Sequence, residues 1–172
     1  MEYKRITQEN FWIAYQIQKV IWPEEPDLQN FIDKSQSIVD DNVSFLVFID
    51  DKVIGITGIY TEDIDDESIW LDWYGVLPEF RGKGYGEKIL LDTIEYCRKL
   101  KKYNYLRLDT TYLEGRPAIN LYDKIMTFKE KYTIEDNDIP NNWLIYTYSF
   151  NGDKKLWNNK YLGLSEYYEN CK

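Results

Sequence analysis

Three glycines at alternate positions over residues 82–86 constrain this 172-residue chain more than any other feature of its sequence. A strand-like apolar run that ends near Val76 precedes them, and Pro78 prevents its continuation as a strand. Apolar residues at helical spacing over residues 87–100 follow them. The pattern therefore predicts a strand, a glycine-rich turn and an amphipathic helix in direct succession.

The predicted turn has the composition of an anion-binding site. Glycine lets a ligand approach the main chain closely, and the first turn of a helix leaves N–H groups unpaired at the positive end of its dipole. Arg81, Lys83 and Lys88 add positive charge in a chain that is otherwise acidic, with 21 Lys and Arg against 30 Asp and Glu. A ligand that carries a phosphate or pyrophosphate is the direct inference.

Three other interpretations of the glycines compete with this one. A Walker P-loop requires Gly-Lys-Ser/Thr, which does not follow. The dinucleotide fingerprint G-x-G-x-x-G has a different spacing, and the chain lacks a run of βα units. A connection without any ligand is the third interpretation, but three glycines and two cations at a helix start exceed what a simple turn needs.

The composition excludes several kinds of chemistry and partner. A net charge of −9 argues against nucleic acid and anionic membrane surfaces, and it suits partners that are cationic or small. The absence of His removes Ser-His-Asp and Cys-His catalysis and most imidazole-based zinc sites, so we expect no metal. Two cysteines argue against a disulfide framework, and neither a signal peptide nor a run of roughly 20 apolar residues is evident. We therefore expect a soluble, cytoplasmic protein.

The order of the predicted elements, β-α-α-β-β-β-α-β-α-β-β, indicates a mixed α/β (α+β) fold with one central sheet. The predicted helices cover residues 7–21, 28–39, 87–100 and 117–126. After a short N-terminal strand, the predicted strands cover residues 44–49, 53–60, 68–76, 105–110, 129–134 and 143–150. The tail from Asn151 is polar and aromatic, and we expect helix around residues 164–168.

The run from Val76 to Gly86 resembles motif A of the GNAT family of N-acetyltransferases, whose signature is Arg/Gln-x-x-Gly-x-Gly/Ala. Arg81, Gly84 and Gly86 occupy the three signature positions. Residues 118–128 resemble the family's Ala-x-x-Leu-Tyr-x-Lys-x-Gly-Phe segment, and the two motifs stand in the order that the fold requires. The resemblance implies one mixed, mostly antiparallel sheet flanked by helices over residues 1–150, with residues 151–172 as an extension of the same domain.

The resemblance also implies acetyl-coenzyme A (acetyl-CoA) as the acetyl donor. In the family, the pyrophosphate is held by backbone amides, and the main chain of Val76 and Leu77 would pair with the pantetheine arm like an added strand. The residues whose backbone would hold the pyrophosphate are Arg81, Gly82, Lys83, Gly84, Tyr85, Gly86 and Glu87. A splay between strands 68–76 and 105–110 would admit the arm.

Two positions depart from the family's pattern in the second motif. Gly115 stands three residues before its Ala, where the family often has Asn, which affects one side-chain contact to the cofactor. Met126 falls where Gly is expected, and Phe128 arrives one residue late. This second departure concerns the turn into the next strand more than the chemistry.

Acetyl transfer needs a neutral amine, a polarised thioester carbonyl and a proton for the departing thiolate. The resemblance places Tyr122 where a phenol would protonate the leaving group, a transfer that is uphill by only about 2 kcal/mol for unperturbed pKa values. Asp72 alternates with Tyr74 and Val76 on one strand face, and it would relay the amine proton or pair with the ammonium if that face lines the acceptor cleft. A carboxylate hydrogen-bonded across the sheet is the equal alternative.

Acidic residues mark a second candidate region for the acceptor. Glu24, Glu25 and Asp27 lie between the first two predicted helices, which border the acceptor site in this fold, and they would attract a cationic amine. A solvated acidic loop is the alternative interpretation. Tyr74 would wall the acceptor pocket, or else pack in the core.

The sequence therefore predicts an acetyl-CoA-dependent N-acetyltransferase in which a primary amine attacks directly in a ternary complex. The acceptor would be a small cationic amine or the amino group of a peptide. Two alternatives stay open: a non-catalytic acyl-CoA-binding module, and an interaction protein that docks or forms a homodimer through residues 151–172.

Overall fold

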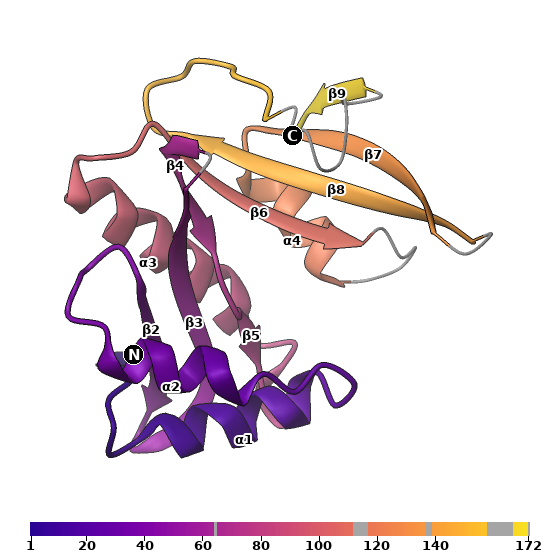
Figure 1. The fold of residues 1–172 in the computed structure, drawn as a ribbon. Coiled ribbons are helices and arrows are strands. Elements are labelled where there is room, and N and C mark those ends of the chain that lie inside the picture. Colours follow the sequence, from indigo (N-terminus) through magenta and orange to yellow (C-terminus); the bar gives the residue numbers. More distant parts are fainter. Residues whose placement is uncertain (64, 112–116, 137–138, 158–166, 172) are drawn as a thin grey trace. The chain divides into compact units, whose positions relative to one another are not determined.

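The computed structural model describes residues 1–63, 65–111, 117–136, 139–157 and 167–171. The chain divides into two compact units, residues 1–102 and 103–172, and each has a sheet of antiparallel strand pairs and its own helices (Figure 1). The described part of the tail belongs to the second unit. The predicted mixed α/β class, with a mostly antiparallel sheet flanked by helices, is confirmed.

The sheet of the first unit has the strand order β1-β2-β3-β4, and the short strand β5 also pairs with β3. Its strands are β1 (Glu2–Arg5), β2 (Val43–Ile49), β3 (Lys52–Glu62), β4 (Asp65–Leu71) and β5 (Gly75–Val76). The predicted hairpin of β2 and β3 is confirmed, and Asp50 and Asp51 form its turn with φ angles of 48° and 62°. Aspartate tolerates this left-handed conformation better than most residues, and two such residues match the twist of a tight hairpin.

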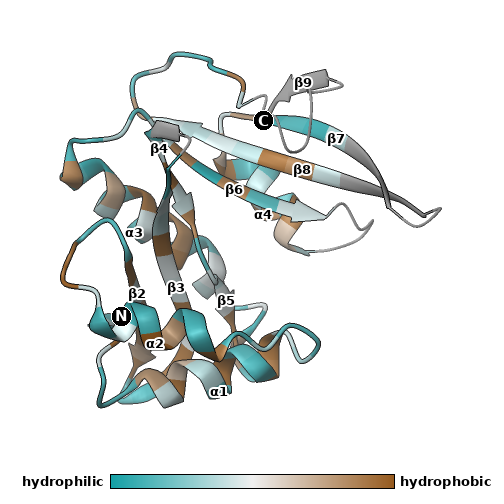
Figure 2. Ribbon diagram, viewed as in Figure 1, coloured by the Kyte–Doolittle hydropathy of each residue, from teal (hydrophilic) through white to brown (hydrophobic). Residues whose placement is uncertain are grey.

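Helices cover both faces of this sheet. The helices of the first unit are α1 (Phe11–Ile21), α2 (Leu28–Gln36) and α3 (Tyr85–Leu100), with a short 3₁₀ turn at Pro78–Phe80. On the α1 and α2 side, one core cluster includes Ala14, Phe31 and Ile56, and on the α3 side another includes Val47 and Ile89. The alternation of apolar and polar colour along these helices reflects their inward and outward faces (Figure 2).

A β-bulge lies where the sheet approaches the glycine-rich segment. The register of β2 and β3 shifts between Val47 and Phe48, so that Ile54 is the extra residue on β3. The bulge turns the Ile54 side chain into the α3-side core and presents its carbonyl oxygen to the N–H of Leu77, at 2.8 Å. Bulges aim single groups in this way beside functional sites.

The predicted continuous strand over residues 68–76 is wrong, because β4 ends at Leu71 and β5 begins only at Gly75. A straight strand would place Asp72 and Tyr74 on one face. Instead, Asp72 bonds to a residue of α2 and Tyr74 to a residue of α3, and these helices lie on opposite faces of the sheet. The break in the strand allows the two side chains to diverge.

The sheet of the second unit has the order β6-β8-β7-β9, with every described pair antiparallel. Its elements are β6 (Tyr105–Thr111), α4 (Pro117–Ile125), β7 (Phe128–Asp136), β8 (Ile139–Ser149) and β9 (Tyr167–Asn170). The helix expected around residues 164–168 is wrong for its described part, because β9 pairs with residues 128–131 of β7. Its residues 164–166 lie outside the described part of the chain.

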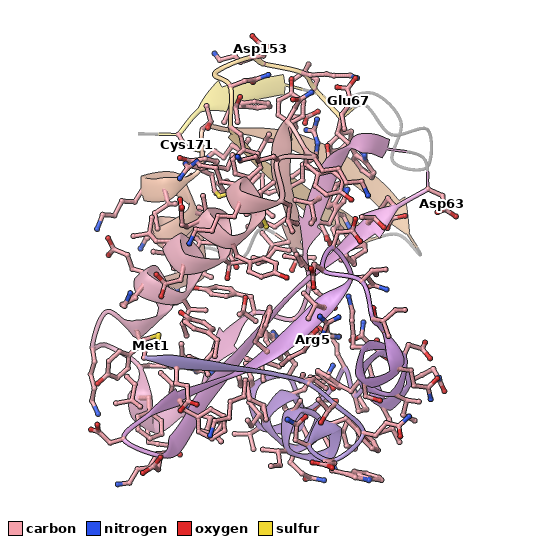
Figure 3. All side chains as sticks on the ribbon, turned by 90° about the vertical axis from the view of Figure 1, so that its left-hand side faces the viewer. Met1, Arg5, Asp63, Glu67, Asp153 and Cys171 are labelled. Carbon is pink, nitrogen blue, oxygen red and sulfur yellow. The ribbon has the colours of Figure 1, made fainter. Side chains whose placement is uncertain are left out.

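The start of the tail is held by a buried ion pair of the second unit. Arg107 and Glu130 lie 3.6 Å apart with side chains that are 2% and 0% exposed. The Arg107 guanidinium also donates to the carbonyl oxygen of Lys155 (2.9 Å), and the Glu130 carboxylate accepts from the backbone N–H of Trp157 (3.0 Å). Asp153, which Figure 3 labels, lies in the turn just before this stretch. None of the described helices is long and apolar enough to cross a membrane.

Candidate active site

The glycine-rich segment forms a tight connection between β5 and α3. Leu77 is fixed to the bulge at Ile54, and Pro78 begins the 3₁₀ turn at a position where its missing N–H is not needed. The helix α3 begins at Tyr85 with Gly84 as its N-cap residue. The predicted succession of strand, glycine-rich turn and helix is confirmed.

Two of the three glycines are required by the backbone conformation. Gly82 has φ of 74° and Gly84 has φ of 80°, in the left-handed region that side chains disfavour. A Cβ atom added at either position would meet no heavy atom within 4 Å. The space beside both residues is therefore open, which is the condition for a ligand to approach the main chain closely.

The first turn of α3 offers hydrogen-bond donors without a protein acceptor. No side chain caps the helix, and the first backbone bond into it is from Lys88 N–H to the carbonyl oxygen of Gly84, at 3.2 Å. Among the described residues, none accepts from the backbone N–H groups of residues 82–86. Such donors at the positive end of a 16-residue helix have the chemistry that favours an anion. The predicted binding of a pyrophosphate there stays a prediction.

The basic side chains of the motif make different contacts. Arg81 donates through Nε to the carbonyl oxygen of Val76 (2.9 Å), and no described acceptor contacts its two Nη atoms. Lys83 is exposed and bonds only weakly to a backbone oxygen, at 3.2 Å. Lys88 is paired with Asp92 on the next turn of α3, at 3.0 Å, so its charge is already matched. Arg81 and Lys83 are therefore the cations best placed to meet an anionic ligand.

Tyr74 fixes the first turn of α3 from the sheet. Its hydroxyl donates a 2.6 Å hydrogen bond to the carbonyl oxygen of Gly86, and its ring packs with Val76 and Ile89. The first turn of the helix is thereby held by a side chain that leaves the N–H groups exposed. The sequence did not reveal this contact, and the predicted role of Tyr74 in the acceptor pocket stays a prediction.

Asp72 forms an ion pair with a buried lysine of α2. The Nζ atom of Lys34 lies 3.1 Å from Asp72 Oδ2, and the two side chains are 4% and 10% exposed. Lys34 also donates to Asn42 Oδ1 (2.5 Å) and to the carbonyl oxygen of Ile59 (2.7 Å). Burial lowers the pKa of the Lys34 ammonium, while the charge and hydrogen bond of Asp72 oppose that shift. The predicted role of Asp72 in proton transfer stays a prediction.

Lys34 is the main residue that sequence reasoning missed here. It follows Phe31 by three residues, so it lies on the inward face of α2 rather than on the solvated face expected of a lysine. The sequence pattern could have indicated this position, because Lys34 lies on the same face of an amphipathic helix as the apolar Phe31.

The acidic turn between α1 and α2 is built by a buried glutamine. Gln18, which is fully buried, donates to the carbonyl oxygen of Glu25 and accepts from the N–H of Asp27, both at 3.0 Å. Asp27 caps α2 by accepting from the N–H of Asn30 at 3.0 Å, so its carboxylate has a structural contact. Glu24 and Glu25 are exposed, and the attraction of a cationic amine by these three carboxylates stays a prediction.

Tyr122 lies on α4 of the second unit. Its side chain is 7% exposed, and its ring lies 5.3 Å from that of Tyr146. The Tyr146 hydroxyl donates to Asp123, which Lys129 also contacts, both at 2.8 Å. Because the glycine-rich segment belongs to the first unit, the role of Tyr122 toward the leaving group stays a prediction.

The departures from the second motif are local. Met126 is 3% exposed and Phe128 is fully buried at the start of β7, so the turn after α4 is filled by apolar side chains. The expectation that this departure concerns the turn more than the chemistry stays a prediction. Gly115 lies outside the described residues.

The buried cysteine is enclosed by the core, and its thiol is kept in the neutral form. Cys97 lies on the inward face of α3 and is 1% exposed. Burial raises the pKa of its thiol to about 12, so the reactive thiolate is not populated near neutral pH.

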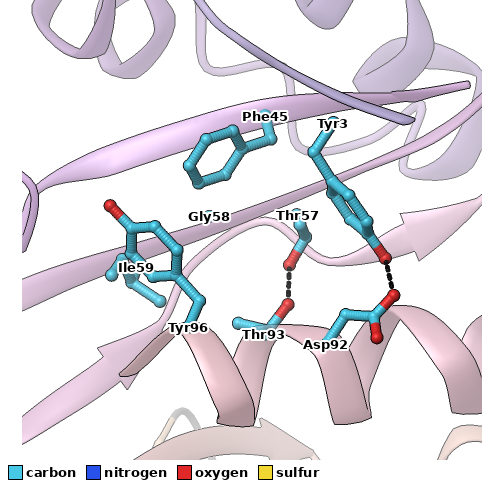
Figure 4. A pocket seen from close by; sticks show the side chains of 8 residues that line it. All are labelled: Tyr3, Phe45, Thr57, Gly58, Ile59, Asp92, Thr93 and Tyr96. Atoms are coloured by element: carbon cyan, nitrogen blue, oxygen red, sulfur yellow. Dashed lines mark hydrogen bonds between the residues drawn. The ribbon is translucent and has the colours of Figure 1, made fainter. Parts of the chain in front are cut away.

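A cavity of about 140 Å³ lies between the sheet and α3 in the first unit (Figure 4). Its polar groups are bonded to one another: Tyr3 donates to Asp92 at 2.7 Å, and Thr57 and Thr93 are 3.0 Å apart. The Tyr96 hydroxyl donates to the carbonyl oxygen of Asp40. The cavity therefore presents mainly carbon and differs in chemistry from the donor-rich start of α3.

The family assignment rests on a match over most of the chain. The model of the acetyltransferase (GNAT) family matches residues 7–128, which include the glycine-rich segment and the motif around Tyr122. This chain belongs to the GNAT acetyltransferase family. The resemblance inferred from the two motifs is thereby confirmed. No curated protein sequence matches the chain.

Solved structures share the GNAT fold of this chain at low sequence identity. Arabidopsis thaliana NAA60 in complex with acetyl-CoA covers 88% of the chain with 99% of its own length, at 16% identity and a TM-score of 0.66. A chimera of the Vibrio cholerae spermidine N-acetyltransferase SpeG and hSSAT covers 87% of the chain with 96% of its own length, at 16% identity and a TM-score of 0.68. A GNAT acetyltransferase from Elizabethkingia anophelis with acetyl-CoA bound covers 87% of the chain with 97% of its own length, at 19% identity and a TM-score of 0.60. At these identities the likeness shows the fold alone.

Proposed function

We propose that this protein transfers an acetyl group from acetyl-CoA to a primary amine. The observation that carries the proposal is the uncapped start of α3, where the N–H groups of residues 82–86 have no acceptor among the described residues. A pyrophosphate supplies the negative oxygens that these donors lack. Solved relatives of the same fold contain acetyl-CoA, which supports this choice of ligand.

The cofactor would be held mainly by main-chain groups. The amides of residues 81–87 would bind the pyrophosphate, with Arg81 and Lys83 adding charge, and the backbone of Val76 and Leu77 would pair with the pantetheine arm. The Leu77 N–H is bonded to the Ile54 carbonyl oxygen, the Leu77 carbonyl oxygen accepts from the Phe80 N–H at 2.9 Å, and the Val76 carbonyl oxygen accepts from Arg81 Nε. The pantetheine arm would therefore share these carbonyl acceptors or replace their present donors.

The transfer would proceed by direct attack in a ternary complex. The amine nitrogen forms a bond to the thioester carbonyl carbon, the carbon–sulfur bond breaks, and the amine loses a proton. Tyr122 would give its hydroxyl proton to the departing sulfur, and a proton from the amine would restore the phenol through solvent or Asp72. Proton transfer by a placed side chain contributes about 10²–10⁴-fold to the rate.

The acceptor is proposed to be a small cationic amine or the amino group of a peptide. A net charge of −9 and the exposed carboxylates of Glu24 and Glu25 favour a cation. One structural neighbour is named as a spermidine N-acetyltransferase, which supports the inclusion of polyamines among the candidates.

The proposal is tested by release of free thiol from acetyl-CoA in the presence of polyamines, aminoglycosides, amino acids and peptides. At least one amine is expected to release thiol well above the rate of hydrolysis. Tyr122→Phe is expected to keep acetyl-CoA affinity and lose about 10²-fold or more of the rate. Tyr146→Phe, which removes the hydroxyl of the neighbouring ring, is the matched control and should change the rate little.

The same assay addresses a non-catalytic acyl-CoA-binding module. If calorimetry finds acetyl-CoA binding but no amine releases thiol, the binding module replaces the enzyme. If acetyl-CoA does not bind, both functions fail.

A further inference from the structure

Beneath α2, a group of buried polar side chains surrounds Asp72. The Lys34 ammonium has three acceptors, Asn42 Oδ1, the Ile59 carbonyl oxygen and Asp72 Oδ2, and is therefore fully bonded. Asn30 Nδ2 donates to the same oxygen of Asp72 at 3.3 Å. One carboxylate oxygen thus takes two donors and fixes the carboxylate in place.

The other acceptors of this group lack donors. Within the described part of the chain, no group donates to Asp72 Oδ1, and the buried Asn30 Oδ1 has no hydrogen-bond partner. The Ser44 hydroxyl oxygen, also buried, has none either. Buried polar atoms are almost always bonded, so the unbonded oxygens of Asn30 and Ser44 require an explanation, whereas Asp72 Oδ1 belongs to a side chain that is 10% exposed.

A ligand that supplies N–H groups explains the set. Asp72 Oδ1 and Asn30 Oδ1 can only accept hydrogen bonds, so they match a donor and repel an anion or a carbonyl. The charge of Asp72 is balanced by Lys34, which leaves hydrogen bonding as the dominant attraction. Asp72 keeps 10% of its side chain exposed, so this corner can be reached from outside.

The group also lies close to the cofactor segment along the chain. Val76 follows Asp72 by four positions, so their Cα atoms are at most about 14 Å apart. Between them, Trp73 packs on Trp22 with ring centroids 5.0 Å apart, and Tyr74 bonds to Gly86. Both ends of this short stretch are therefore anchored, one beside α2 and one beside the start of α3.

We propose that Asp72 Oδ1 and Asn30 Oδ1 bind an N–H of the acceptor amine, and that Lys34 is the positioning residue that holds Asp72 for this contact. The inference rests on the proposed function, and it assigns Asn30 and Lys34 to amine recognition. Asp72 here anchors the amine by hydrogen bonding.

Asp72→Asn is the sharpest variant, because it keeps the shape and an oxygen that can accept from Lys34, while it removes the negative charge and replaces the accepting Oδ1 by a donating NH₂ group. Asn30→Leu removes the second acceptor, and Lys34→Met removes the positioning charge. Gln36→Leu, an amide-to-leucine change at an exposed position of the same helix, is the matched control for Asn30→Leu. Thermal unfolding identifies any variant that fails to fold.

The readout is the KM for the best amine of the panel, set against the KM and calorimetric Kd for acetyl-CoA. Asp72→Asn and Asn30→Leu are each expected to raise the amine KM about 10-fold, with the acetyl-CoA constants unchanged and Gln36→Leu neutral. Lys34→Met should raise the amine KM similarly. A merely structural role would lower stability and leave the amine KM unchanged, and that result would overturn the proposal.

Failure of the proposed function has a separate signature. If wild type releases no thiol with any amine, calorimetry with spermidine decides the inference alone. If the wild-type protein releases heat on binding spermidine and Asp72→Asn does not, the result supports binding of the amine by Asp72 and Asn30. If spermidine binding releases equal heat in both proteins, or none in the wild type, the unbonded oxygens are assigned to ordered water. Either result would overturn the proposed contact with the amine.

Discussion

The hydroxyl of Tyr74 donates a hydrogen bond of 2.6 Å to the carbonyl oxygen of Gly86, joining the end of the broken strand to the first turn of α3. The bond uses a carbonyl group of the helix and leaves its N–H groups available. It thus fixes the orientation of the donor array without occupying it.

Tyr74→Phe is therefore expected to weaken CoA binding about 3- to 10-fold, in line with the loss of one hydrogen bond. The ring remains, so core packing with Val76 and Ile89 is retained. Isothermal calorimetry with CoA measures the change. Tyr15→Phe is the control, since no described residue bonds to the Tyr15 hydroxyl, and an equal loss in both variants would contradict the role of Tyr74.

Gly84→Ala separates backbone strain from ligand contact. Alanine at φ of 80° is strained by about 1 kcal/mol, and its Cβ would occupy the open space beside the main chain. Gly152→Ala is the matched control, because Gly152 has φ of 86°, also has nothing within 4 Å, and lies in the second unit. Both variants should lose similar stability in urea unfolding, whereas only Gly84→Ala should lose CoA affinity, by 10-fold or more. Unchanged affinity in Gly84→Ala would remove the main chain there from the site.

Alkaline stability is expected to depend on Tyr3 (Figure 4). Burial, then the hydrogen bond and charge of Asp92, raise the pKa of Tyr3 above its ordinary value of about 10. The folded state therefore favours the neutral phenol, and this stabilisation is complete below about pH 10 and is lost as the pH rises further. Thermal unfolding from pH 8 to 11 should show a steeper loss of Tm in wild type than in Tyr3→Phe. Parallel curves would show that Tyr3 does not contribute.

The order of elements could be predicted because periodicity and turn chemistry determine it locally. The hairpin at Asp50 and Asp51, the start of α3 and the succession of strands agree with the sequence pattern. The break at residues 72–74 could not be predicted, since it arises from contacts of Asp72 and Tyr74 with helices on opposite faces of the sheet. Likewise, β9 depends on an open edge of β7, which only the assembled sheet reveals.

Part of the candidate site could likewise be predicted from the sequence, and part of it could not. The donor array follows from glycine spacing and helix physics, so residues 82–86 were identified from the sequence. Lys34 was missed, because a lysine on an amphipathic helix is normally solvated and its partners come from distant segments.

The tail is expected to contribute stability rather than a partner surface. Removal of residues 154–172 deletes the Lys155 carbonyl and the Trp157 N–H, which bond to the buried Arg107 and Glu130. Hydrogen bonds to charged groups are worth about 1.5–3 kcal/mol each, so the free energy of unfolding should fall by at least about 3 kcal/mol. Urea unfolding measures the contribution of the tail to stability, and light scattering measures whether the tail holds a dimer together. Unchanged stability with a halved mass would favour the tail as a dimer contact.

The most direct test of the account is a titration of the ¹⁵N-labelled protein with CoA, followed by the backbone amide resonances. If the start of α3 holds the diphosphate, the amides of residues 82–87 are expected to shift most, in the direction of stronger hydrogen bonding. Removal of the pyrophosphate from the ligand, as in pantetheine, is expected to abolish those shifts. Binding that leaves these amides unmoved, or equal shifts with pantetheine, would contradict the claim that the start of α3 holds a diphosphate.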